Sequence, residues 1–152
     1  LVSGSRRDRM SPTRVLVPLD GSPLADEALT HALETFDCPV TVLNVVTPLD
    51  SQMSEGGLLD GDESRREAAH ERASDLVETA RQRASEADRD LETVVETGDP
   101  AETILAYVDG HDVDHVVMGG HGGERGELAA RLLGTVAIAV VTEAPVTVTV
   151  VR

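Results

Sequence analysis

The residues best suited to chemistry lie in one glycine-rich stretch near the end of the chain. A short apolar run, Val116 to Met118, is followed by five glycines within eight residues, beginning at Gly119. Glycine lets the backbone adopt positive φ and approach a ligand closely. Successive N–H groups in such a loop, with a helix N-terminus beside them, form a concavity suited to phosphate. The stretch therefore indicates an anion site, and a loop without a ligand is the alternative because glycine also marks turns.

Asp20 is a second candidate for contact with a ligand. It follows the apolar run Arg14–Leu19, which predicts a strand, and it precedes a helix start. Ligands of open parallel sheets bind beyond the carboxyl ends of the strands, where the strand order reverses. If this strand and the glycine-bearing strand are neighbours there, Asp20 faces the glycine loop and can contact a base or a ribose. Asp20 can equally be a turn residue that caps the next helix, and both interpretations remain open.

Three histidines and three aspartates near the glycine stretch suggest a metal site at first sight: His111, His115 and His121, with Asp109, Asp112 and Asp114. Their spacing does not favour zinc, because His115 opens a strand and His111 lies in the preceding turn. His121 is better interpreted as a loop residue near the phosphates. Arg125, the one cation among the glycines of residues 119–126, either offsets phosphate charge or is solvated.

The charge balance excludes several classes of function. The formal net charge is −15, and all 13 basic residues are arginine. Without lysine the chain has neither a Walker-A lysine nor a Schiff-base lysine. Nucleic acid is not expected as a partner, because neutralising its phosphates needs a basic face. An acidic surface without lysine resembles proteins of salt-loving organisms. At ~1 M salt the Debye length is about 3 Å, so this charge would hardly repel an anionic ligand.

The length of 152 residues predicts one domain, over residues 11–152. Residues 1–10 are interpreted as an N-terminal extension or a cloning remnant, because they are polar and basic and have no hydrophobic centre. No apolar run reaches the ~18–20 residues of a membrane span, so no membrane partner is expected, and the cytoplasm is the expected compartment. Cys38, the one cysteine, is predicted to be a small buried residue and not a reactive thiol.

Strands and helices are predicted to alternate along the chain. The predicted strands are apolar runs rich in Val, Leu and Thr: Arg14–Leu19, Pro39–Val46, Leu91–Thr97, Val116–Met118 and Pro145–Val151. Helix starts are predicted where a capping residue precedes proline, at Ser22-Pro23 and Asp99-Pro100. Residues 47–62 are predicted as loop and residues 63–87 as a long helix.

The predicted helices carry small or aliphatic residues at the 3–4 spacing of an amphipathic helix. Their buried faces are expected to be Ala25, Ala28, Leu29, Ala32, Leu33 and Phe36; then Ala69, Ala73, Leu76, Val77, Ala80, Ala84 and Ala87; then Ala101, Ile104, Leu105 and Val108. Thr135–Val141 is rich in β-branched residues. We predict helix there, because a parallel sheet needs a crossover before its last strand. The alternation predicts an α/β fold, a parallel sheet with helices on both faces.

Several short motifs follow one another in order: Val15-Leu-Val-Pro-Leu-Asp-Gly-Ser22, Val42-Leu-Asn-Val45, Gly98-Asp-Pro-Ala101, Val117-Met-Gly-Gly-His-Gly122, and Leu132-Leu-Gly-Thr-Val136 before Ala144-Pro-Val146. Together they resemble the universal stress protein family, over nearly all of the chain from Met10 onward. The resemblance implies a Rossmann-like single domain with an open five-stranded parallel sheet of order 3-2-1-4-5. It also implies a homodimer through the last strand, residues 145–151, and in one subgroup ATP bound at the switch point.

The ATP-binding pattern of that subgroup assigns a set of nucleotide-binding residues. The adenine and ribose side would comprise Pro18, Leu19, Asp20 and the backbone of Val45. The phosphate side would comprise Met118, Gly119, Gly120, His121, Gly122, Gly134, Thr135 and Val136. The resemblance further implies that the Thr135 hydroxyl lies near the terminal phosphate or its Mg²⁺.

The chain departs from the ATP-binding pattern in two places. Gly122 and Gly134 enclose eleven residues, two more than the pattern has. The longer loop can bulge outward, or it can misplace Gly134 and Thr135, and a displacement of ~1 Å already matters in a preorganised site. Asn44 stands where the family usually has histidine, and its side chain is not expected to touch the nucleotide.

Three functions are consistent with these features. The first is a cytoplasmic stress or energy-state regulatory module that binds ATP with Mg²⁺ and acts on a protein partner that the sequence does not indicate. The second is a dimeric interaction protein of the same fold that has lost the nucleotide. The third is a slow ATP hydrolase, which the sequence supports least, because only Asp20 and His121 offer a general base.

Overall fold

Five strands and four helices alternate in the computed structural model, which describes residues 12–47, 59–121 and 133–152, with backbone alone for residues 59–63 and 65. The strands are β1 (Val15–Pro18), β2 (Val40–Val46), β3 (Leu91–Thr97), β4 (His115–Gly119) and β5 (Thr147–Val151). The helices are α2 (Pro23–Thr35), α4 (Leu59–Glu86), α5 (Pro100–Gly110) and α7 (Thr135–Glu143). None of these helices is long and apolar enough to cross a bilayer.

All five strands are parallel, and their order β3-β2-β1-β4-β5 confirms the prediction. The order reverses between β1 and β4. In the pair β1–β4, Val15 lies opposite His115 and Leu16 opposite Val116, and the pairing ends there. In contrast, β1 stays paired with β2 to its last residue. The carboxyl ends of β1 and β4 therefore diverge and leave a crevice at the switch point.

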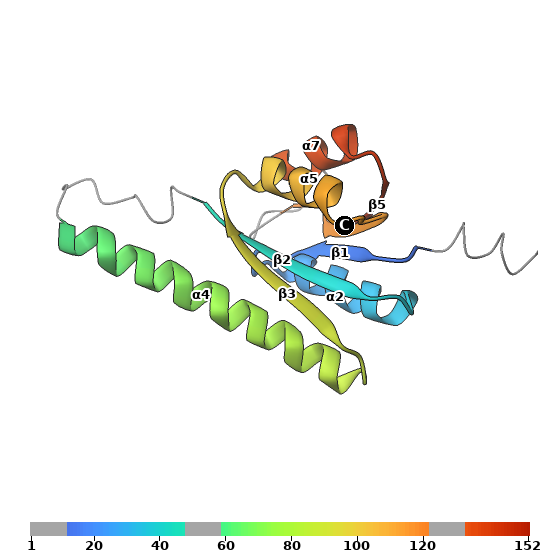
Figure 1. Cartoon of the computed structure of the whole chain (residues 1–152), viewed down its shortest axis with the longest axis horizontal. Helices are drawn as coiled ribbons and strands as arrows, with labels where there is room; N and C mark the ends of the chain where they lie inside the picture. Colours follow the sequence, from blue (N-terminus) through green and yellow to red (C-terminus); the bar gives the residue numbers. More distant parts are fainter. Residues whose placement is uncertain (1–11, 48–58, 122–132) are drawn as a thin grey trace, which may run out of the picture.

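Helices cover both faces of the sheet, α2 and α4 on one and α5 and α7 on the other (Figure 1). Successive side chains of β1 pack alternately against the helices on the two faces of the sheet. Val15 and Val17 pack with α2, and Leu16 packs with α5 and α7. All three are fully buried. Burial on both faces explains why β1 is a continuous apolar run that does not alternate with polar residues.

Two of the predicted helix starts are confirmed by their capping bonds. The Ala25 N–H donates to the Ser22 hydroxyl at 3.3 Å, and the Glu102 N–H donates to the Asp99 carboxylate at 3.0 Å. Both helices begin at proline, which fits the first helical position because its missing N–H would have no partner there. The predicted α7 is also confirmed, although β-branched residues fill it.

The buried face of α5 differs in part from the prediction. Ile104 and Val108 are buried as expected, but Ala101 and Leu105 are only half-buried, and Tyr107 is buried in their place. Tyr107 lies three residues after Ile104 and so shares its side of the helix. It was missed because a residue with a hydroxyl was not counted among the apolar positions.

Helix α4 begins earlier than predicted, at Leu59, within the segment expected to be loop. Its first residues include Asp60 and Asp62, which suggested a turn, but acidic residues also stabilise the first turn of a helix through the helix dipole. The buried residues of α4 are Ala69, Ala73, Ala80 and Ala84. Ala87 of the predicted stripe is exposed beyond the helix end. The N-terminal part of α4 extends past the carboxyl ends of the strands (Figure 1).

Candidate functional site

A cavity of about 750 Å³ opens at the carboxyl ends of β1, β2 and β4. Its volume lies within the ~300–1,000 Å³ of small-molecule sites. Ten of the predicted nucleotide-binding residues line it: Pro18, Leu19, Asp20, Val45, Met118, Gly119, His121, Gly134, Thr135 and Val136. Gly120 lies behind the cavity wall. Gly122, Arg125 and the inserted part of the glycine loop fall outside the described residues.

The end of β4 and the start of α7 meet at the mouth of this cavity. The Gly134 N–H donates to the Gly120 carbonyl at 2.6 Å, and the Gly120 N–H donates to the Val151 carbonyl at 2.7 Å. A Cβ on Gly134 would lie 3.2 Å from the His121 Cα, so no larger residue fits without parting the two segments. Gly120 thus joins the cavity mouth to β5, although it does not itself line the cavity.

The N-terminus of α7 points at the cavity with open donors. Its N-cap is Gly134, which has no side chain to accept a hydrogen bond, in contrast to Ser22 on α2 and Asp99 on α5. The first N–H groups of a helix have no partner within the helix. Here those residues, Thr135 to Ala137, line the cavity. The partial positive charge of the helix end therefore faces the space where a phosphate could bind.

His121 presents a second open hydrogen-bonding group. Its Nδ1 is enclosed by protein, yet it has no hydrogen-bond partner among the residues that the structure describes. An enclosed polar atom without a partner costs about 1–3 kcal/mol, so such atoms usually mark a missing ligand, ion or water. Because His121 lines the cavity beside the start of α7, a rotation of its ring that exposes Nδ1–H would let an anion bound there accept a hydrogen bond from it.

Asp20 is both a turn residue and a cavity residue. Its Oδ1 accepts the Ser22 N–H at 2.9 Å, across a turn in which Gly21 has a φ of +88°. That φ lies in the left-handed region, which glycine adopts without strain. The same carboxylate is exposed and lines the cavity. The turn therefore fixes Asp20 at the crevice, where its second oxygen can accept a hydrogen bond from a ligand hydroxyl.

Asn44 has a structural role that the sequence did not reveal. It is buried, it lines the cavity, and its side-chain amide donates to the Leu19 carbonyl at 2.8 Å. The Leu19 N–H in turn donates to the Leu43 carbonyl at 2.9 Å. Asn44 therefore fixes the peptide that leads into Asp20. Its position as a polar residue within the apolar strand Val40–Val46 was the available signal.

Replacement of Asn44 by leucine is expected to lower the free energy of unfolding by about 1–3 kcal/mol, because the buried Leu19 carbonyl loses its donor. Urea denaturation would measure the change. Asn44→His is the matched variant, since a ring N–H can replace the amide donor, and it is expected to lose less stability than Asn44→Leu. Equal stability of the leucine variant and the unaltered protein would contradict this role for Asn44.

Helix α4 contributes a wall of the cavity that was not foreseen. Ala69 and Ala73 pack with Val46 at the end of β2, and Arg72 and Leu76 line the cavity beside them. On the opposite face of the sheet, Pro100 and Ile104 of α5 also line it. The sequence shows that these residues belong to helices. It does not show that α4 passes over the carboxyl end of β2, which depends on how the helix packs.

His111 and His115 lie outside the cavity and have local partners. The His115 ring contacts Phe36 and its Nε2 lies 2.8 Å from the Thr149 hydroxyl, and burial lowers its pKa. The His111 ring stacks on Tyr107. Cys38 is half-buried, and burial raises the pKa of its thiol, so it is not activated as a nucleophile. Within the described ranges, no group of three or more His, Cys, Asp or Glu side chains could hold a metal ion.

Comparison with models of known protein families shows the family to which the chain belongs. The model of the universal stress protein family matches residues 12–152. The chain belongs to this family. A search of curated protein sequences found no match.

Solved universal stress proteins have the same fold. The protein UspA from Lactobacillus plantarum is 29% identical, with a TM-score of 0.77, and the match covers 93% of this chain and 99% of that one. A family member from Arabidopsis thaliana, solved with AMP bound, is 22% identical with a TM-score of 0.67 over 92% of this chain and 91% of that one. A universal stress protein in complex with cAMP is 22% identical with a TM-score of 0.66, covering 93% of this chain and 98% of that one. At this identity the last two comparisons show the fold alone.

Proposed function

We propose that this universal stress protein binds an adenine nucleotide, ATP with Mg²⁺, in the crevice between β1 and β4. The observation that carries the proposal is the open N-terminus of α7 beside the glycine turn at Gly119–His121, both lining one cavity. That arrangement suits phosphate, which backbone N–H groups and a helix N-terminus bind together. The AMP and cAMP complexes of two relatives support a purine nucleotide as the ligand.

The two ends of the cavity suit the two ends of a nucleotide. The phosphates would lie at the start of α7 and accept hydrogen bonds from its first N–H groups and from His121. The exposed Thr135 hydroxyl could ligate a Mg²⁺ that the phosphates bring. The base would lie toward β2, with its edge at the backbone of Val45 and one face on Pro18 and Leu19. Asp20 would then accept a hydrogen bond from a ribose hydroxyl.

The site has a direct connection to the sheet edge, which suggests how binding could regulate the protein. Gly120 bonds both to Gly134 at the cavity mouth and to Val151 of β5. A nucleotide that supplies partners to α7 and His121 would hold this junction in one arrangement and so bias the β5 edge. A cytoplasmic sensor of stress or energy state could work in this way through a partner that recognises the edge.

Titration calorimetry with Mg·ATP tests the nucleotide proposal. We expect saturable heat with one site per chain, and tighter binding in ~1 M than in ~0.1 M KCl, because the net charge of −15 repels a polyphosphate and salt screens that repulsion. Absorbance near 260 nm in the purified protein would show a retained nucleotide, since one Tyr and one Phe absorb little there. No heat at millimolar ATP in either salt would overturn the proposal and favour an interaction protein without a nucleotide.

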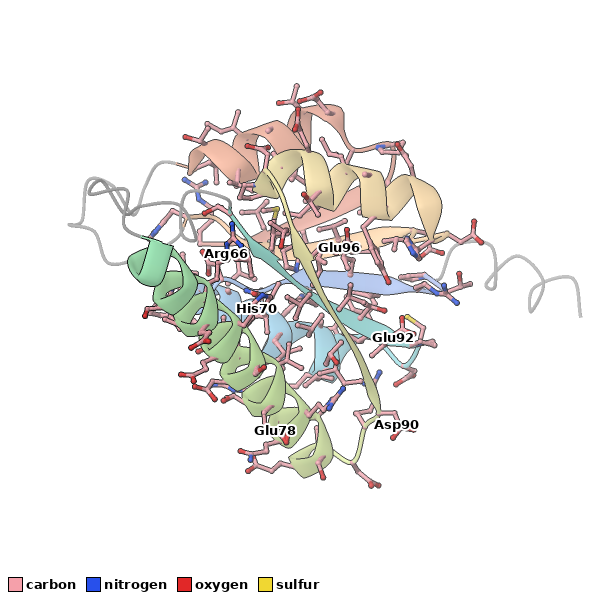
Figure 2. The ribbon with its side chains drawn as sticks, turned by 60° about the vertical axis from the view of Figure 1, so that its left-hand side comes forward. Arg66, His70, Glu78, Asp90, Glu92 and Glu96 are labelled. Carbon is pink, nitrogen blue, oxygen red and sulfur yellow. The ribbon has the colours of Figure 1, made fainter. Side chains whose placement is uncertain are left out.

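We also propose a homodimer through the β5 edge, residues 145–151. The residues of β5, Thr147–Val151, are uncharged, and α7 beside it exposes Ile138 and Val141. The other sheet edge, β3, carries Glu92 and Glu96 (Figure 2). Charged residues on an edge strand discourage pairing with another chain. Of the two edges, β5 is therefore the one suited to association.

Sedimentation in molar KCl tests the dimer. The double variant Ile138→Glu/Val141→Glu is expected to be monomeric, because charges would be buried against the second copy without partners. Both residues are exposed, by 51% and 45%, so the fold should tolerate the change. Val95→Glu, which alters a 41% exposed residue on the β3 edge, is the matched control and should leave the dimer intact. A monomeric unaltered protein would refute the proposal.

A further inference from the structure

The base end of the cavity offers no aromatic side chain for stacking. The chain has one Phe and one Tyr. Phe36 contacts His115 at the amino end of β4. Tyr107 of α5 is buried in the core between the sheet and α7, and its ring stacks on His111. Neither lines the cavity. Proteins usually cover the flat face of a nucleobase with an aromatic ring or with the guanidinium plane of arginine.

Arg72 of α4 is the one cation among the described residues that line the cavity. It is exposed, and within the described parts of the chain no hydrogen bond or ion pair holds its guanidinium. Two arginines further along the same helix are held by partners: Arg81 donates to the Thr93 hydroxyl at 2.7 Å, and Arg83 lies 3.7 Å from the Asp26 carboxylate. Arg72 is therefore available for a ligand in a way that these two arginines are not.

The surroundings of Arg72 lie toward the end of β2, where the base is proposed to bind, and away from the start of α7. Leu76, one turn further along α4, reaches to within 3.3 Å of where a Cβ on Gly21 would lie, so this side of the helix crosses the β1–α2 turn. Arg72 lies one turn closer to the end of α4 that extends past the strands (Figure 1). Helix α4 covers the sheet face opposite α7, whose N-terminus offers the phosphate donors.

The residues beside Arg72 are small and apolar. Ala69 and Ala73 pack with Val46 at the end of β2, and all three line the cavity. Alanine at both positions keeps the helix surface low beside Arg72, so a planar ring in the cavity can reach the guanidinium. A guanidinium is planar, delocalised and weakly hydrated, which lets it stack on a ring at little cost in solvation.

We propose that Arg72 is a base-contacting residue whose guanidinium stacks on the purine in place of an aromatic ring. This assignment rests on the proposed nucleotide site and adds to it a residue that selects the base. A purine offers a larger face than a pyrimidine. The unaltered protein should therefore bind ATP more tightly than CTP, and the loss of Arg72 should reduce that preference.

Titrations of ATP and of inorganic tripolyphosphate into Arg72 variants test the stacking role. Arg72→Gln is expected to weaken ATP binding about 10-fold and to leave tripolyphosphate binding unchanged, because stacking of one base contributes roughly that factor. Arg72→Phe should restore ATP binding, since it supplies a stacking face without charge. Arg72→Lys should not, since it keeps the charge without the plane. Arg66→Gln, at an exposed arginine on the same helix (Figure 2), is the control. Arg66 does not line the cavity, so this variant should match the unaltered protein.

The outcomes separate this inference from the nucleotide proposal. If Arg72→Gln binds ATP like the unaltered protein, the stacking role is overturned while the nucleotide site stands. If Arg72→Lys keeps full ATP affinity while Arg72→Gln loses affinity for both ATP and tripolyphosphate, Arg72 contacts phosphate and the stacking role is overturned. If the unaltered protein binds no ATP, the nucleotide proposal fails before any variant is compared.

Discussion

Replacement of Gly134 by valine is expected to weaken ATP binding by more than ~100-fold, the largest effect that we expect from one substitution in the site. A Cβ at this position would already lie 3.2 Å from the His121 Cα and 3.5 Å from the Gly120 carbonyl oxygen. The two valine methyl groups extend further, so the two segments must part. The 2.6 Å hydrogen bond between the Gly134 N–H and the Gly120 carbonyl would then be lost, and the start of α7 would move away from the phosphates.

Calorimetry with Mg·ATP measures this effect, with circular dichroism to show that the variant is folded. Gly110→Val is the matched control, because a Cβ on Gly110 meets nothing within 4 Å, and it should bind like the unaltered protein. Thr135→Val is a gentler second variant, since Thr135 is exposed and the change removes only the hydroxyl proposed for Mg²⁺. Unchanged ATP affinity in both Gly134→Val and Thr135→Val would show that phosphates bind elsewhere.

Replacement of Gly119 by alanine is expected to lower the free energy of unfolding by about 1–3 kcal/mol, which corresponds to a fall in melting temperature of roughly 4–10 °C. A Cβ there would lie 2.9 Å from the Leu24 Cβ and 3.0 Å from the Ala25 backbone nitrogen. These atoms belong to the first turn of α2 and cannot rotate away. Helix α2 would have to shift relative to β4, against which it packs in the core.

Thermal unfolding followed by circular dichroism measures the change. Gly110→Ala serves as the control, because its Cβ would have open space and alanine in a helix stabilises a chain by about 0.4–1 kcal/mol through the unfolded state. The control is therefore expected to melt at the same or a slightly higher temperature. A Gly119→Ala variant that is as stable as the control would mean that β4 and α2 tolerate a wider separation than their packing indicates.

Much of the fold could be predicted because the relevant signals are local. Ser22-Pro23 and Asp99-Pro100 mark helix starts through the geometry of a cap and a proline ring, which need only adjacent residues. Helix α7 is the exception, because local signals alone did not predict it. The β-branched content of Thr135–Val141 permits a strand, and only the need for a crossover between parallel strands favoured helix. A rule about connections, and not local propensity, gave the correct prediction there.

Errors in the prediction arose where two local signals compete or where packing decides. Aspartate, present at positions 60 and 62, is common in turns but also suits the first turn of a helix, and the structure has a helix there. No partner could be assigned to the Asn44 side chain, because a position in the middle of a strand gives no indication of what the side chain contacts. Its bond to Leu19 joins residues that are 25 positions apart.

The sequence by itself determined the strands, the helices and the parallel sheet, because hydrophobic period, caps and connections can be recognised in short segments. The strand order and most of the residues that line the crevice were implied by the resemblance to the universal stress protein family. Only the tertiary structure decided that Gly134 bonds to Gly120, that Asn44 holds the peptide before Asp20, and that Arg72 reaches the cavity from α4. The physical reason is that these contacts depend on the positions of separately folded segments. Such positions follow from the packing of whole helices on the sheet, to which each residue contributes only a small part.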